Sequence, residues 1–123
     1  MIFIDYNDKR PIYEQIIDRF QTLIINGALE PNMQLPSVRS LAIELAINAN
    51  TIQRAYSELE RDGYIYSVKG RGNFVRDDKS LADRQQRKLL QDLKQQLQTC
   101  KSFGISEQEI QSCLQEIYME VKE

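Results

Sequence analysis

A helix expected over residues 49–61 carries side chains that could contact nucleic acid. Asn50, Thr51, Gln53, Arg54 and Ser57 are spaced so that they share the outer side of this helix. Amides can hydrogen-bond adenine, arginine can bind guanine or a phosphate, and a threonine methyl can contact thymine. The simpler alternative is an ordinary solvated surface, because every amphipathic helix has a polar side.

The opposite face of this helix is apolar and needs a packing partner. A matching apolar stripe over residues 38–45 predicts a preceding helix that packs against it. The two stripes are Ile52, Ala55, Tyr56 and Leu59 on one helix, and Val38, Leu41, Ala42 and Leu45 on the other. Ser37 and Asn48 are the expected N-caps, and Arg39 lies off its stripe, where it faces solvent or a ligand.

A glycine-tipped β-hairpin is expected directly after the two helices. Gly63 ends the second helix, and residues 64–68 and 74–75 favour the two strands. Residues 69–72 read Lys-Gly-Arg-Gly, in which the glycines permit a tight turn close to a phosphate and the cations attract one. Helix, turn, helix and hairpin in this order predict a winged helix-turn-helix, a module that usually places its second helix in a DNA major groove.

Five motifs follow one another in the part of the chain that contains these elements. They are Pro-Ile-Tyr-Glu-Gln-Ile at 11–16, Leu-Pro-Ser-Val-Arg at 35–39, Asn-Thr-Ile-Gln-Arg-Ala-Tyr at 50–56, Leu-Glu-Arg-Asp-Gly-Tyr-Ile at 59–65 and Gly-Arg-Gly at 70–72. Together they resemble the GntR family of bacterial transcription regulators, and the third motif and the short C-terminal tail resemble its YtrA subfamily. The resemblance implies double-stranded DNA as the partner.

Carried over position by position, the resemblance implies DNA contacts from both helices and from the hairpin tip. With Ser37 and Lys69 added as neighbours of these positions, the candidate DNA-binding residues are Ser37, Arg39, Asn48, Asn50, Thr51, Gln53, Arg54, Lys69, Gly70, Arg71 and Gly72. The chain departs from many relatives at Ala49, where they have arginine or proline. Any base contact made by an arginine at that position is therefore absent.

The N-terminal part of the chain is expected to support the two helices. Ile12, Ile16, Phe20, Leu23 and Ile24 recur at helical spacing and predict an amphipathic helix that ends near residues 26–27. Residues 2–5 could form a short edge strand. Residues 27–34 are expected to be a loop, with Leu29 and Leu35 anchoring it in the core.

Composition excludes several classes of protein. The 123 residues hold one domain, or one small domain with an appendage. No apolar run approaches the roughly 20 residues of a membrane span, and the apolar N-terminus is too short for a signal peptide, so we expect no membrane association and a cytoplasmic location. Without histidine, and with Cys100 and Cys113 far apart, we expect no metal or cofactor and interpret both cysteines as packing residues. No phosphate-binding loop or carboxylate pair indicates an enzyme.

Two further amphipathic helices are expected after residue 80, joined by a break at residues 101–104 into an antiparallel pair. Ser106 and Glu109 form a capping box at the start of the second helix. A pair this small has little core of its own, so we expect its apolar stripes to meet a second copy of the chain. The expected dimer interface comprises Leu89, Leu90, Leu93, Leu97, Ile110, Leu114, Ile117, Tyr118 and Val121. The tail is too short to enclose a metabolite within one chain, and the sequence leaves open a small-molecule effector at the dimer interface.

The predicted fold class is mainly α with a small β-hairpin, in two parts. Residues 1–76 form a winged helix-turn-helix DNA-binding domain, and residues 77–123 form a helical dimerisation or effector segment. Two functions fit this organisation. The first is a sequence-specific transcription regulator, a repressor, that binds a two-fold symmetric operator as a homodimer. The alternative is a winged-helix protein–protein interaction module without DNA binding.

Charge helps to choose between the two functions. The net charge of −2 argues against a generic nucleic-acid binder, for which a basic domain is expected. Cations nevertheless occur on both helices and on the hairpin tip, which a module that binds only protein does not need. We therefore favour the regulator, with modest affinity per chain, strong salt dependence and a need for dimerisation to link two half-sites.

Overall fold

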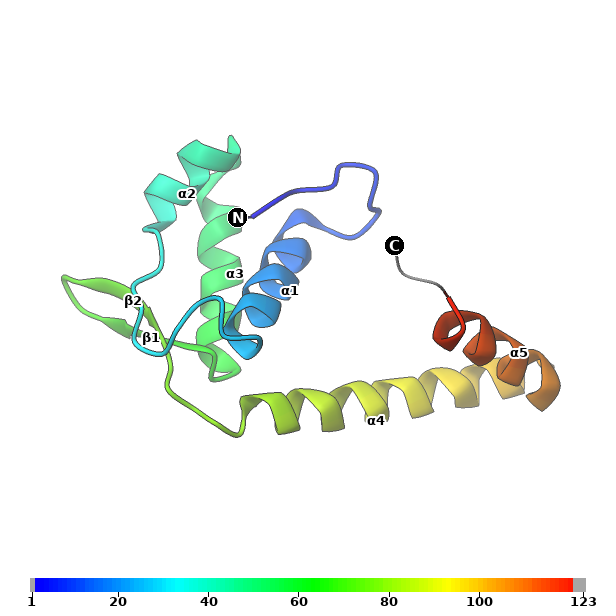
Figure 1. The fold of residues 1–123 in the computed structure, drawn as a ribbon. Coiled ribbons are helices and arrows are strands. Elements are labelled where there is room, and N and C mark those ends of the chain that lie inside the picture. Colours follow the sequence, from blue (N-terminus) through cyan, green and yellow to red (C-terminus); the bar gives the residue numbers. More distant parts are fainter. Residues whose placement is uncertain (1, 121–123) are drawn as a thin grey trace. The chain divides into compact units, whose positions relative to one another are not determined.

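A computed structural model describes residues 2–120 (Figure 1). Within these residues the elements are α1 (Ile12–Ile25), α2 (Val38–Leu45), α3 (Ala49–Arg61), β1 (Ile65–Val68), β2 (Gly72–Val75), α4 (Leu81–Ser102) and α5 (Glu107–Tyr118). They confirm the predicted fold class, mainly helical with one small antiparallel hairpin. The chain divides into two compact units, Met1–Ala82 and Asp83–Glu123. This division lies a few residues after residue 76, because Leu81 in the first turn of α4 is buried in the first unit.

The core of the first unit lies between α1, α2 and α3. Phe20 of α1 and Tyr56 of α3 meet edge to face, with ring centroids 5.6 Å apart. The Tyr56 hydroxyl donates a hydrogen bond to the Pro36 carbonyl at 2.8 Å, which ties α3 to the segment that leads into α2. Burial raises the pKa of Tyr56, so this hydroxyl stays protonated and remains a donor. The buried apolar residues include Ile16, Phe20, Leu29, Leu35, Leu41, Ile52, Ala55, Tyr56, Leu59, Ile65 and Val75, which confirms the expected core faces and both loop anchors.

Local capping fixes where α2 and α3 begin. The Ser37 hydroxyl accepts a hydrogen bond from the Ser40 amide at 3.0 Å, and the Asn48 side chain accepts one from the Asn50 amide at 2.8 Å. Ala46 adopts a left-handed conformation, with φ of 55°, and this reverses the chain between the two helices. Both predicted N-caps are confirmed.

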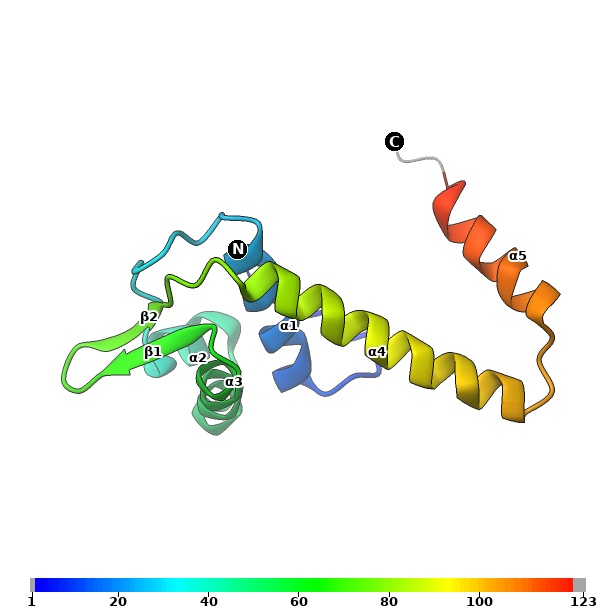
Figure 2. The ribbon, with the colours of Figure 1, turned by 90° about the horizontal axis from the view of Figure 1, so that it is seen from below.

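The hairpin formed by β1 and β2 pairs Ile65 with Val75 and Val68 with Gly72 (Figure 2). A third segment, which the sequence predicts only as a loop, lies along the free edge of β2. The Leu35 amide donates to the Asn73 carbonyl at 2.9 Å, and an isolated bridge joins Gln34 to Phe74. The hairpin is therefore held on one side by the segment that precedes α2.

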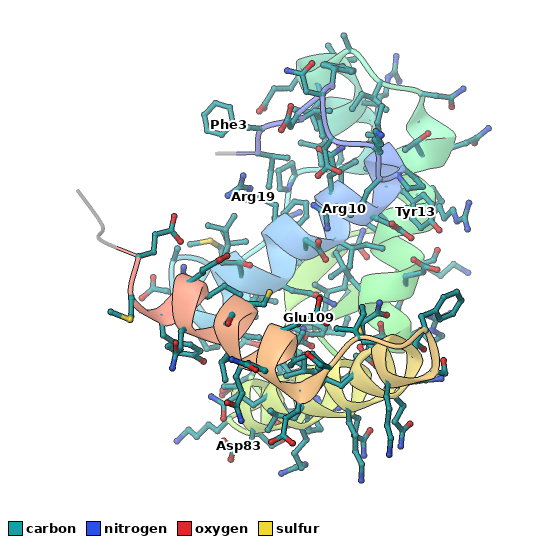
Figure 3. All side chains as sticks on the ribbon, turned by 90° about the vertical axis from the view of Figure 1, so that its right-hand side faces the viewer. Phe3, Arg10, Tyr13, Arg19, Asp83 and Glu109 are labelled. Atoms are coloured by element: carbon teal, nitrogen blue, oxygen red, sulfur yellow. The ribbon has the colours of Figure 1, made fainter. Side chains whose placement is uncertain are left out.

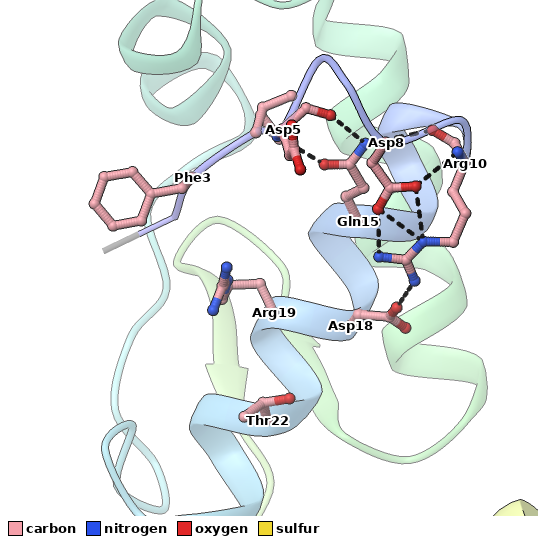
Figure 4. A pocket seen from close by; sticks show the side chains of 9 residues that line it. Phe3, Asp5, Asp8, Arg10, Gln15, Asp18, Arg19 and Thr22 are labelled. Carbon is pink, nitrogen blue, oxygen red and sulfur yellow. Dashed lines mark hydrogen bonds and ion pairs between the residues drawn. The ribbon is translucent and has the colours of Figure 1, made fainter. Parts of the chain in front are cut away.

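The expectation of an edge strand at residues 2–5 is wrong, because these residues form no strand and the backbone of Asp5 pairs with a side chain. The Gln15 side chain accepts from the Asp5 amide at 2.9 Å and donates to the Asp5 carbonyl at 3.1 Å, as a neighbouring strand would (Figure 4). Beside it, Arg10 forms ion pairs with Asp8 and Asp18, and the hydrogen bond from Arg10 lowers the pKa of Asp8. Asp8, Arg10 and Asp18 line a hollow between the N-terminal segment and α1, and their ion pairs hold this segment on α1.

The second unit consists of most of α4, together with α5. The capping box is confirmed, since the Ser106 hydroxyl accepts from the Glu109 amide at 3.1 Å and the Glu109 carboxylate accepts from the Ser106 amide at 3.0 Å. The hydrogen bonds from Ser106 lower the pKa of Glu109. Helix α5 turns back after Gly104 but diverges from α4, so the expected helix pair is open (Figure 2).

Because the pair is open, the apolar stripes of α4 and α5 are not covered within one chain. Among the predicted interface residues, Leu97 and Ile110 are partly buried, whereas Leu89, Leu90, Leu93, Leu114, Ile117 and Tyr118 are exposed. Val121 lies outside the described residues. Cys113 is exposed, so its interpretation as a packing residue does not hold within one chain, whereas Cys100 is half-buried.

Candidate nucleic-acid interface

Helix α3 presents a polar face because its apolar face is anchored in the core. Asn50, Gln53 and Arg54 are exposed, and Thr51 is half-buried at the edge of the same face. The Gln53 side-chain amide donates to the Ser57 hydroxyl at 3.2 Å, which holds its long side chain along the helix. Amide, hydroxyl and guanidinium groups on one rigid helix form a surface suited to base edges and phosphates.

Asn48 and Ser37 are engaged differently from the other candidate residues. The side-chain oxygen of Asn48 accepts a hydrogen bond from a backbone amide of α3, and that of Ser37 accepts one from a backbone amide of α2, so each residue caps its helix. Both residues are exposed at the start of a helix, where backbone amides and the helix dipole favour an anion. Arg39 lies in the first turn of α2 and is exposed. Within the described residues it makes no hydrogen bond or ion pair.

Arg54 is held by a residue that was not among the sequence-predicted candidates. Its guanidinium carbon lies 3.7 Å from the centroid of the Tyr13 ring, and its Nη2 donates to the Tyr13 hydroxyl at 3.0 Å. Figure 3 shows Tyr13 on α1, on the side next to α3. The signal that could have found Tyr13 is its place in the Pro-Ile-Tyr-Glu-Gln-Ile motif, which served above only for the family resemblance.

The hairpin tip, called the wing here, comprises residues 69–72. Gly70 and Gly72 have φ of 79° and 116°, which lie in the left-handed region that favours glycine. The Gln34 side chain donates to the Arg71 carbonyl at 2.8 Å, and a Cβ at Gly72 would lie 3.1 Å from the same Gln34 nitrogen. Gln34, also missed from the sequence, therefore holds the wing tip, and its side-chain nitrogen lies close to the place that a side chain at position 72 would occupy.

The cations of these elements differ from two other arginines of the same unit, although Arg19 and Arg76 likewise form no ion pair within the described residues. Arg10 and Arg61 are paired with carboxylates. Among the described residues, no carboxylate pairs with Arg39, Arg54, Lys69 or Arg71, all four of which are exposed. One cation on α2, one on α3 and two on the wing thus remain available for anions such as DNA phosphates.

A helix-turn-helix followed by a two-stranded wing defines the winged helix-turn-helix class of proteins. Within this class, residues 12–75 match the family described as bacterial regulatory proteins, gntR family, and the chain belongs to that family.

Relatives support this assignment over nearly the whole chain. The chain is 36% identical to the HTH-type transcriptional repressor YtrA of Bacillus subtilis (strain 168), over 99% of this chain and 95% of the relative. It superposes with a TM-score of 0.70 on a GntR family transcriptional regulator from Listeria monocytogenes, at 34% identity over 90% of this chain and 98% of the other. The predicted resemblance to YtrA-like GntR regulators is confirmed.

A third comparison concerns a structure that contains DNA. The DNA-binding domain of AraR in complex with operator ORE1 superposes with a TM-score of 0.52 at 27% identity, over 61% of this chain and 92% of that domain.

For the described residues of the present chain, no helix has the length and apolar character needed to cross a membrane.

Proposed function

We propose that this DNA-binding transcription regulator is a homodimeric repressor that binds a two-fold symmetric operator. The observation that carries the proposal is the group of unpaired, exposed cations on α2, α3 and the wing, which flank the polar face of α3. The relatives support it, since one is a transcriptional repressor and one structure holds a related domain on its operator. Cytoplasmic location and the absence of enzymatic activity are part of the proposal.

The candidate residues other than Arg54 fall into three groups in this arrangement. Asn50, Thr51 and Gln53 read base edges in the major groove, because they occupy the polar face of α3. Arg39, at the start of α2, contacts a base or a phosphate. Ser37 and Asn48 cap α2 and α3, and the N-termini of these helices lie next to the DNA phosphates. The wing, residues 69–72, contacts the flanking DNA backbone or the minor groove through Lys69, Gly70, Arg71 and Gly72.

The homodimer forms through the tail. Helices α4 and α5 leave five leucine and isoleucine side chains exposed within one chain, those of Leu89, Leu90, Leu93, Leu114 and Ile117. A second copy offers the same surfaces for a symmetric interface. The winged helix-turn-helix of one protomer has few cations and therefore modest affinity for DNA. Simultaneous binding of two linked half-sites by the dimer compensates for this.

Selection of genomic DNA fragments by the purified protein at moderate salt, followed by sequencing, tests this function. We expect enrichment of an inverted repeat whose half-sites are spaced for two recognition helices. If a folded, dimeric protein enriches no sequence, the operator-binding proposal fails. The alternative of a protein–protein interaction module would then have to be reconsidered.

Gln34→Ala is expected to weaken operator binding by roughly 3- to 10-fold. Without the hydrogen bond from Gln34 the wing tip is less ordered in the free protein, so the cost of ordering it is added to the free energy of DNA binding. Fluorescence anisotropy with the selected operator measures the affinity. Gln34 is exposed, so the unfolding temperature should change little, and this serves as the control for the fold. Wild-type affinity in Gln34→Ala would show that the wing does not depend on this hydrogen bond.

A further inference from the structure

We propose that Tyr13 is a positioning residue that holds Arg54 for a DNA phosphate and keeps it from reading a base. This inference rests on the proposed function and assigns a role in DNA binding to α1. It also divides the exposed face of α3 into residues that set affinity and residues that set sequence preference.

The geometry of the pair fixes the guanidinium in two ways. The Arg54 guanidinium carbon lies 3.7 Å from the centroid of the Tyr13 ring, a distance at which the cation is attracted to the ring face. The Arg54 Nη2 also donates to the Tyr13 hydroxyl at 3.0 Å. A stacked contact and a hydrogen bond to the same residue restrict both the position and the rotation of the planar guanidinium. Arg54 is thereby directed from α3 toward α1.

The pair leaves the charge of Arg54 uncompensated. No described carboxylate forms an ion pair with Arg54, and its partner Tyr13 is not an acidic residue. By contrast, Arg61 in the last turn of the same helix lies 3.4 Å from Asp62 and 3.9 Å from Glu58. The remaining guanidinium donors of Arg54 make no hydrogen bond within the described residues. A fixed cation with free donors and no anion nearby is suited to a phosphate oxygen.

A base contact is less compatible with the same geometry. Arginine reads guanine by extending into the groove and giving two donors to its O6 and N7 atoms. One Nη2 hydrogen of Arg54 is already given to Tyr13, and the side chain is stacked on α1. Sequence preference is then left to the side chains of α3 that are not held in this way, Asn50, Thr51 and Gln53.

The test compares Arg54→Ala, Tyr13→Phe, Tyr13→Leu and the double variant Tyr13→Leu with Arg54→Ala in the full-length protein. Affinity is measured against salt concentration for the selected operator and for operators with single base-pair changes. Arg61→Ala is the matched control, because it removes an arginine from α3 that is already paired with carboxylates. Circular dichroism and the unfolding temperature establish that each variant is folded, and Tyr13→Phe keeps the ring if Tyr13→Leu is not folded.

For Arg54→Ala we expect affinity to fall roughly tenfold, by the same factor for every operator sequence. Each phosphate that is no longer bound should lower the slope of log affinity against log salt by about 0.9, so the slope of a dimer should fall by about two. Tyr13→Leu should lose part of the same affinity, Tyr13→Phe less, and Tyr13→Leu should have no further effect once Arg54 is alanine. Arg61→Ala should bind as the wild type does.

Three results would overturn the inference while leaving the proposed function intact. The first is a change in the ranking of operator sequences by Arg54→Ala, which would make Arg54 a base reader. The second is an equal effect of Tyr13→Leu with and without Arg54, which would mean that Tyr13 acts through the fold. The third is wild-type affinity and salt slope in Arg54→Ala. Failure of the wild-type protein to bind any DNA would instead overturn both proposals.

Discussion

Replacing one apolar residue in each tail helix, Leu93→Gln with Ile117→Gln, is expected to give monomers that have lost most of their operator affinity. Leu93 is 50% exposed and Ile117 is 61% exposed within one chain, so neither supports the fold of its own protomer. Their burial by a second copy is the expected source of dimer stability. Without the link between half-sites, affinity should fall by about 100-fold or more.

Analytical ultracentrifugation gives the oligomeric state of this variant, and anisotropy gives its affinity for the operator. Lys88→Gln with Glu116→Gln is a matched control, because it changes one residue on each helix outside the apolar stripes and leaves the net charge unchanged. The control should remain dimeric and bind normally. Dimers in the Leu93→Gln and Ile117→Gln variant would place the interface elsewhere on the chain.

Most of the first unit could be predicted from sequence because its signals are local. The N-caps Ser37 and Asn48 act on amides two or three residues away, and the apolar stripes of α2 and α3 repeat at the helical period. Gly63, which follows the end of α3, has φ of 84°, as expected for a residue just beyond a helix. Signals of this kind can be read from a short window of sequence without knowledge of the rest of the fold.

The contacts that orient the candidate DNA-binding residues could not be predicted in this way. Tyr13 and Arg54 are 41 residues apart, and Gln34 and Arg71 are 37 residues apart. Each pair is brought together only when α1 packs on α3, or when the segment before α2 lies along β2. The wrong expectation of a strand at residues 2–5 has the same cause. The polar partner of that segment is the side chain of Gln15, and side-chain pairing has no periodicity.

The tail illustrates a different limit. The periodicity of α4 and α5 identifies their apolar stripes, but it does not say which surface covers them. An antiparallel pair within one chain and an open pair that meets a second copy have the same sequence pattern. The open arrangement leaves Leu89, Leu90 and Leu114 exposed, which strengthens the expectation that the stripes belong to an interface between copies.

Arg39→Ala is expected to lower operator affinity more than substitution of any other single cation of the interface. Arg39 is exposed at the start of α2, and unlike Arg54 it has no described partner that fixes its guanidinium. It is therefore free to extend and give two donors to a guanine or a phosphate. Loss of such an interaction costs about 1–3 kcal/mol. A homodimer loses two of them, so a cost of about 2–6 kcal/mol is expected for the complex.

Arg39→Lys separates the two kinds of contact that Arg39 could make. Lysine keeps the charge but lacks the planar pair of donors, so it replaces arginine better at a phosphate than at a guanine. If Arg39 reads a base, Arg39→Lys should be nearly as weak as Arg39→Ala and should relax the preference at one position in each half-site. If Arg39 binds a phosphate, Arg39→Lys should retain most of the affinity. Wild-type affinity in Arg39→Ala would remove α2 from the interface and leave binding to α3 and the wing.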